Sequence, residues 1–169
     1  MGILPGLGHP HHVVSGGQTG VDRAALDAAL ATGISHGGWC PRGRLAEDGV
    51  IPARYLLRET HSAKYHIRTR KNVLDSDATL ILCRGPLSGG TELTARLAVH
   101  HDRPCLVVDL AAEEEEADNV RLWLATHGVG VLNVAGPRES TQPGIGREAY
   151  RFLVRVLTAQ PDGASSPRP

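Results

Sequence analysis

Three glycine-rich segments of the 169-residue chain each lie between a short apolar run and a helical pattern, at 15–20, 84–91 and 133–140. Glycine lets the backbone adopt positive φ and approach a ligand closely, and the N–H groups of the following helix then form an anion site. Hydroxyl, amide and charged side chains supply further contacts. The pattern therefore predicts a phosphate-bearing ligand bound by the polar and glycine residues of these segments: Gly16, Gly17, Gln18, Thr19, Gly20, Ser88, Gly89, Gly90, Thr91, Glu92, Gly136 and Arg138.

A fourth candidate element is the segment Trp-Cys-Pro-Arg-Gly-Arg at 39–44. Arg42 and Arg44 lie two residues apart in a Pro/Gly frame and could grip an oxyanion. Trp39 could stack on a planar ring, although partial burial is the simpler interpretation. Cys40 is expected to be exposed, with flanking arginines lowering the pKa of its thiol. We expect Arg68, on a following helix, to be ordinary surface charge.

Catalytic and metal-binding patterns are sparse. The glycine spacing is neither Gly-x-Gly-x-x-Gly nor the Gly-Lys-Ser/Thr of P-loop proteins. No cysteine–histidine spacing typical of zinc is present. Asp22 and Glu92 are the weak catalytic candidates, and both could equally be acids that complement a helix N-terminus. We therefore expect no metal site, and a binding protein rather than an enzyme.

The elements that must position these residues alternate along the chain. Apolar, β-branched runs predict strands at 13–14, 34–39, 78–83, 104–110 and 129–134, and helical patterns occupy 21–31, 65–74, 92–101, 113–127 and 146–157. Continuous apolar strands indicate burial on both faces. The predicted fold is a Rossmann-like, doubly wound α/β domain with a mostly parallel sheet and helices on both faces. Ligands of such sheets bind beyond the carboxyl ends of the strands.

Length and composition limit the domain organisation and the class of protein. We expect a flexible leader at 1–12, one domain at 13–158 and a disordered tail at 159–169, with a long irregular and functional segment at 40–60. The formal net charge is zero and aromatic residues make up 4% of the chain, so nucleic-acid binding is not favoured. The chain has neither an apolar run of membrane-spanning length nor the features of a signal peptide, which predicts a cytoplasmic protein.

Four stretches together resemble one known family: SGGQTGVDRAALDAAL, GGWCPRGRLAEDGVIPARYLLRET, RTRKNVLDSDATLIL and LSGGTELT. The chain resembles the molybdenum carrier (molybdenum cofactor carrier) family from about residue 13 to 157. That family is Rossmann-like and related to the Lonely Guy and DNA-processing protein A proteins. The resemblance implies a homo-oligomer, a dimer or tetramer, that binds molybdenum cofactor (molybdopterin), a phosphate-bearing pterin carrying molybdenum.

Two relatives suggest alternatives. GPLSGGTELT is similar to the Lonely Guy motif Pro-Gly-Gly-x-Gly-Thr-x-x-Glu, which implies a nucleoside-monophosphate N-glycosidase. The residue three after Thr91 is Thr94, however, and Glu92 stands in a different place from the motif's glutamate. The segment at 13–30 is similar to the glycine turn of the DNA-processing protein A family, which leaves a nucleotide-sensing or nucleic-acid-binding module as the other alternative.

Overall fold

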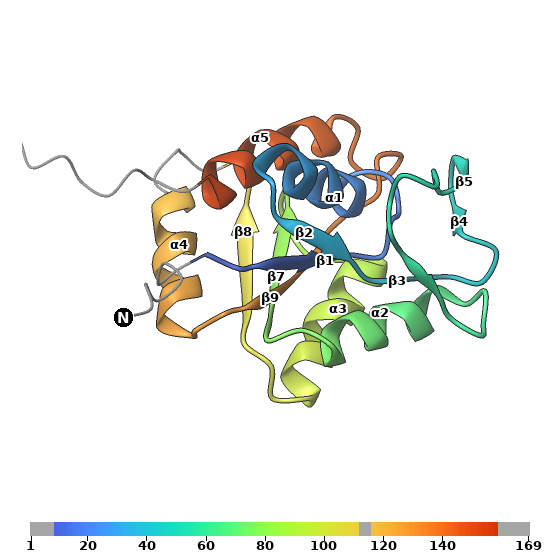
Figure 1. Ribbon diagram of the computed structural model, residues 1–169, viewed down its shortest axis with the longest axis horizontal. Coiled ribbons are helices and arrows are strands. Elements are labelled where there is room, and N and C mark those ends of the chain that lie inside the picture. Colours follow the sequence, from blue (N-terminus) through green and yellow to red (C-terminus); the bar gives the residue numbers. More distant parts are fainter. Residues whose placement is uncertain (1–8, 112–115, 159–169) are drawn as a thin grey trace, which may run out of the picture.

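The computed structural model describes residues 9–111 and 116–158, arranged as Figure 1 shows. Five parallel strands form the central sheet in the order β2-β1-β9-β7-β8. These strands are β1 (His12–Val14), β2 (Ser35–Gly37), β7 (Ala78–Cys83), β8 (Cys105–Asp109) and β9 (Val131–Ala135). The predicted Rossmann-like α/β fold with a parallel sheet is confirmed.

In the described ranges, five helices cover the sheet: α1 (Val21–Thr32), α2 (Tyr65–Leu74), α3 (Gly89–His100), α4 (Glu116–Thr126) and α5 (Ile145–Leu157). Helix α1 packs against α5, which also contacts α4, whereas α2 packs against α3 on the other side of the sheet (Figure 1). All six residues of β7 are buried between the two helical layers. The sheet edge at the carboxyl ends of its strands is therefore flanked by helices from both faces.

The edge strand β8 departs from the expectation of burial on both faces. Val107 is 45% exposed, and only Val108 of this strand is fully buried. Its apolar run resembles that of β7, but β8 pairs with β7 alone and lies at the end of the sheet. An apolar run does not by itself distinguish a central strand from an edge strand.

The segment at 40–60 is more ordered than its sequence indicates. It contains β4 (Leu45–Ala46) and β5 (Gly49–Val50), which form an antiparallel hairpin, while β3 (Trp39–Cys40) pairs with β6 (Arg58–Glu59). The Arg44 side chain organises this segment by donating hydrogen bonds to the carbonyl oxygens of Ile51, Pro52 and Tyr55 at 3.1, 2.9 and 2.9 Å. A guanidinium with five donors can hold several chain carbonyls at once.

The expected exposure of Cys40 is wrong. Cys40 is fully buried in a small apolar cluster with Leu26, Ile51 and Tyr55, and burial raises the pKa of its thiol instead of lowering it. The polar residues around Cys40 in the sequence suggested exposure, but the apolar side chains that cover it come from α1 and from the segment at 51–55.

The leader at 1–12 and the tail at 159–169 stay predictions. Strand β1 already begins at His12, which pairs with Ser35 and Val131, so the last residue of the expected leader belongs to the sheet. Residues 1–8, the first residues of the helix expected at 113–127, and the expected tail at 159–169 lie outside the described residues. No helix within the described ranges is both long enough and apolar enough to cross a membrane.

Candidate functional site

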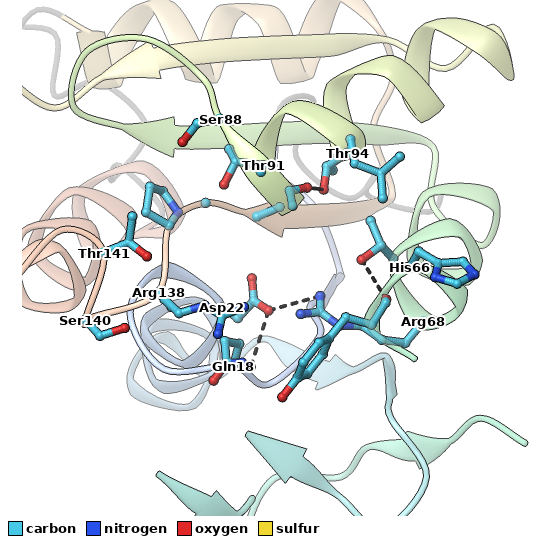
Figure 2. A pocket seen from close by; sticks show the side chains of 18 residues that line it. Gln18, Asp22, His66, Arg68, Ser88, Thr91, Thr94, Arg138, Ser140 and Thr141 are labelled. Atoms are coloured by element: carbon cyan, nitrogen blue, oxygen red, sulfur yellow. Dashed lines mark hydrogen bonds and ion pairs between the residues drawn. The ribbon is translucent and has the colours of Figure 1, made fainter. Parts of the chain in front are cut away.

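The three glycine-rich turns meet at one edge of the sheet. They follow β1, β9 and β7, which are neighbours in the sheet, so their carboxyl ends lie side by side. A cavity of about 400 Å³ opens there. It is lined by residues from all three turns and from α1, α2 and α3, namely Gln18, Asp22, Tyr65, His66, Arg68, Thr69, Ser88, Gly89, Gly90, Thr91, Leu93, Thr94, Ala135, Gly136, Pro137, Arg138, Ser140 and Thr141. Figure 2 shows polar side chains converging on it from opposite walls.

One wall is the N-terminus of α3. The helix begins at Gly89, three residues before the predicted start, because the glycine pair forms its first turn. Ser88 occupies the N-cap without a side-chain cap hydrogen bond, and within the described residues the N–H groups of Gly89 and Gly90 donate to no protein acceptor. A Cβ built on either glycine meets nothing within 4 Å. This helix end is therefore open, with free donors and a favourable dipole for an anion.

A second wall is the N-terminal half of α2, which packs against α3 and has no side-chain cap hydrogen bond at Lys64. The Tyr65 ring contacts two guanidinium groups, those of Arg68 at 5.8 Å and Arg138 at 5.6 Å from its centroid. Arg138 makes no ion pair with any described residue. Because Arg68 is paired with a carboxylate, the groups that favour an anion in this cavity are the open N-terminus of α3 and the guanidinium of Arg138.

The floor of the cavity holds a buried ion pair. Arg68 Nη1 lies 3.2 Å from Asp22 Oδ2, and the two side chains are only 13% and 4% exposed. The backbone N–H of Gln18 donates to the same carboxylate oxygen at 3.3 Å, and Figure 2 shows the other oxygen of Asp22 pointing into the cavity. Burial raises the pKa of Asp22 above its ordinary value, and the nearby Arg68 opposes that shift. The expectation that Arg68 is surface charge is wrong.

The first glycine turn mainly supports this floor. A Cβ on Gly16 would overlap the Arg68 guanidinium, so the missing side chain is what lets the arginine reach Asp22. A Cβ on Gly17 would lie 2.5 Å from Leu57 Cδ1, and one on Gly20 would lie 2.8 Å from the Glu139 backbone nitrogen. Of the predicted contacts in this turn, only Gln18 lines the cavity.

Thr19, the remaining member of that turn, makes hydrogen bonds with other parts of the protein. Its hydroxyl donates to Glu47 Oε1 in the β4–β5 hairpin and accepts the Glu139 N–H at 3.2 Å. Glu47 also accepts a hydrogen bond from the Ser140 hydroxyl. Hydrogen bonds from Ser140 and Thr19 hold the pKa of Glu47 below its ordinary value. The hairpin is thereby fastened to two of the turns that border the cavity.

Most of the residues predicted in the second and third turns line the same cavity. Ser88, Gly89, Gly90, Thr91, Gly136 and Arg138 all line the cavity. Glu92 is exposed and does not line the cavity, so Asp22 is the one catalytic candidate that does. A Cβ on Gly136 would lie 2.8 Å from Val21 Cβ, which shows that this glycine also serves close packing.

The arginine segment lies apart from this cavity. Arg42 is exposed, and Arg44 is engaged with chain carbonyls. The Trp39 indole N–H donates to Asp75 Oδ2 at 2.7 Å, and Lys71 Nζ lies 3.9 Å from the centre of the Trp39 ring. Trp39, Arg42 and Arg44 do not line the cavity. Across the described part of the chain, no group of three or more His, Cys, Asp or Glu side chains could hold a metal ion.

Sequence reasoning missed the α2 contribution, namely Tyr65, His66, Arg68 and Thr69, and it also missed Thr94. Helix α2 follows no glycine turn, so the rule that located the other walls does not apply to it. The stretch RTRKNVLDSDATLIL, which carries part of the family resemblance, includes Arg68 and Thr69 and was the available indication.

Comparison with known proteins agrees with this architecture. The family described as "Circularly permutated YpsA SLOG family" matches residues 13–157. A crystal structure titled "Putative molybdenum carrier protein", from Syntrophus aciditrophicus SB, is 45% identical with a TM-score of 0.85, and the match covers 89% of this chain and 96% of that one. A search of functionally curated proteins found no match. The resemblance seen in the sequence is confirmed, and the chain belongs to the circularly permutated YpsA SLOG family.

Proposed function

We propose that the cavity binds a phosphate-bearing heterocycle, and that the protein stores or carries molybdenum cofactor without transforming it. The observation that carries this proposal is the open N-terminus of α3, where the free N–H groups of Gly89 and Gly90 border a cavity of about 400 Å³. That volume lies within the usual range for small-molecule sites. The similarity to a protein titled as a molybdenum carrier supports the choice of ligand.

In this proposal the phosphate lies at the N-terminus of α3. Gly89 and Gly90 donate from the backbone, Thr91 donates from its hydroxyl, and Arg138 balances the charge. The heterocycle extends toward α2 and the buried Asp22–Arg68 pair. The lining donors are amides, hydroxyls and guanidinium groups, which suit phosphate and a polar ring, and molybdenum stays on the sulfur atoms of its own cofactor.

The test starts with protein purified from a host that makes molybdopterin. The protein is denatured, the extract is oxidised, and pterin fluorescence and molybdenum content are measured per chain. We expect both at near-stoichiometric levels. Incubation with AMP, followed by detection of free adenine, examines the N-glycosidase alternative in the same preparation, and we expect no release.

Gly90→Asp is the decisive variant. Its carboxylate would stand in the proposed phosphate position, and two unit charges about 5 Å apart repel by about 3 kcal/mol at an effective dielectric constant of 20. Pterin retention should therefore fall by about 100-fold in equilibrium terms. Ala53→Asp adds the same charge at an exposed position outside the cavity and is the matched control. Equal pterin in both variants would place the ligand elsewhere.

A homo-oligomer, as the resemblance implies, is a separate expectation. Sedimentation equilibrium of the purified protein, with and without ligand, tests it. A single species at the chain mass would contradict the expectation without affecting the cavity.

A further inference from the structure

The tip of the β4–β5 hairpin, residues 47–50, is attached to the cavity wall through Glu47. The Glu47 carboxylate accepts hydrogen bonds from the Thr19 hydroxyl, from the Ser140 hydroxyl and from the Ser140 N–H, the last at 3.1 Å. Its own N–H donates to Gln18 Oε1 at 2.8 Å. Gln18 and Ser140 line the cavity from two different turns, on the same side in Figure 2, whereas no residue of the hairpin lines it. Glu47 therefore holds two parts of the cavity wall from outside.

The other acidic residue of the tip binds the same side of the protein. Asp48 pairs with Arg23, and Arg23 Nη2 also donates to the Gly17 carbonyl oxygen at 3.1 Å. Both acidic side chains of the tip are therefore tied to the first glycine turn or its helix, and Glu47 is tied to the third turn as well.

The tip has little apolar burial to keep it in place, whereas the base of the hairpin is anchored. Residues 47–50 are all exposed, and Val50 is 70% exposed. At the base, Ala46 packs against the cluster that contains Ile51, and Arg44 binds the carbonyl oxygens of the chain beyond the hairpin. Segments with few buried apolar contacts open locally at a fraction of the free energy of global unfolding. The tip can therefore leave the turns while the base stays fixed.

The two turns stay joined when the tip leaves. The Val21 N–H donates to the Pro137 carbonyl oxygen at 3.2 Å, and the Glu139 N–H donates to the Thr19 hydroxyl at 3.2 Å. Opening the tip therefore frees the lining side chains on one side of the cavity without separating the turns that carry them.

We propose that the hairpin tip is a latch that controls ligand exchange at the cavity, with Glu47 as its closing residue. When the latch is closed, Glu47 fixes Gln18 and Ser140 in place; when it is open, both side chains can move aside and let the ligand pass. This inference rests on the proposed function, since it assumes that the ligand occupies this cavity. It adds the route by which the ligand enters and leaves.

Stopped-flow fluorescence tests the latch by measuring the rates of ligand exchange. The probe is the fluorescent, phosphate-bearing pterin obtained by oxidising molybdopterin. Glu47→Ala removes the three hydrogen bonds that the carboxylate accepts. We expect the association and dissociation rate constants both to rise about tenfold, which corresponds to about 1.4 kcal/mol lost from the closed state. Because a latch acts equally on entry and exit, Kd should change by less than about twofold.

The two rate constants distinguish a latch from a residue that only shapes the wall. If Glu47 only shaped the wall, Glu47→Ala would raise the dissociation rate constant alone and weaken binding, and that result would overturn the proposal. Unchanged rate constants would overturn it too. Val50→Ala truncates an exposed side chain of the same hairpin that makes none of these hydrogen bonds, and this matched control should keep the wild-type rates. Glu47→Gln keeps the shape without the charge and should give intermediate rates.

The proposed function and the latch fail in different ways. If the pterin binds the wild type and is lost in Gly90→Asp, the phosphate site stands, and the rate constants of Glu47→Ala then judge the latch alone. If the pterin does not bind the wild type, or binds Gly90→Asp equally well, the proposed function itself fails together with this inference.

Discussion

Gly16→Ala should destabilise the protein through a residue more than fifty positions away. A Cβ at position 16 would lie 2.7 Å from Arg68 Nε and closer still to Cζ and Nη1. Ordinary contacts begin near 3.5 Å, so the guanidinium must retreat by about 1 Å or more. The 3.2 Å pair between Arg68 and Asp22 would then exceed 4 Å and break. Gly16 does not have a positive φ, so alanine adds no backbone strain of its own.

The expected magnitude follows from the burial of the pair. Breaking a buried ion pair typically costs about 3–5 kcal/mol because one charge is left uncompensated. Here the displaced arginine can reach solvent and Asp22 can take up a proton, since burial already raises its pKa, so we expect a smaller cost of about 2–3 kcal/mol. For a chain of this size that is a fall in Tm of roughly 4–12 °C.

A double-mutant cycle isolates the mechanism. Denaturant unfolding is measured for the wild type, Gly16→Ala, Arg68→Ala and the double variant. In the Arg68→Ala background no guanidinium remains to be displaced, so Gly16→Ala should cost less than about 0.5 kcal/mol there. An equal cost in both backgrounds would show that Gly16 is required for something other than Arg68, and no cost in the wild type would show that the pair re-forms.

The remaining predictions concern the other walls and the hairpin. Gly90→Ala should raise the free energy of unfolding by about 0.5–1 kcal/mol, because the position is helical, lacks positive φ and has open space, yet it should weaken phosphate binding in calorimetry. Arg44→Lys should cost about 2 kcal/mol in denaturant unfolding, because one ammonium cannot replace several guanidinium hydrogen bonds, and it should leave ligand affinity unchanged. Glu47 has a folded pKa below its ordinary 4.5, so its bonds to Thr19 and Ser140 stabilise the hairpin above that pH and are lost as the pH falls below it. Hydrogen exchange at 45–50, corrected for intrinsic rates, should therefore lose protection as the pH falls below 4.5. Glu47→Gln should show less protection and a weaker pH dependence, of which the Asp48–Arg23 pair supplies the remainder.

The fold was predictable because its main elements have strong local patterns. The bounds of α2 and β7 are those predicted, and α1 differs by one residue. The start of α3 was placed too late because two glycines have low intrinsic helix propensity, and the structure tolerates them in the first turn. The segment at 40–60 could not be predicted, because its order depends on Arg44 reaching carbonyls eight and eleven residues away.

The site was predictable in place but not in composition. Glycine turns at strand ends located the sheet edge where the cavity opens, because that inference needs only the direction of the chain and the parallel sheet. The burial of Arg68 depends on how closely α2 packs against the turn before α1. The pattern of one sequence does not reveal that packing. An arginine on a polar helix therefore has the same appearance whether it is solvated or paired with a buried Asp22.

The glycines themselves show why type and spacing are insufficient. At Gly16, Gly17 and Gly20 the space of a Cβ is already taken by protein atoms, so these residues are explained by packing within the chain. At Gly89 and Gly90 that space is empty and the neighbouring N–H groups are free. Gly89 has a φ of +53°, which by itself favours glycine, but Gly90 has no positive φ. Glycine lowers stability relative to alanine in a helix, so Gly90 is best explained by a ligand that approaches the backbone. That contrast is why the α3 turn, and not the more glycine-rich α1 turn, is expected to hold the phosphate.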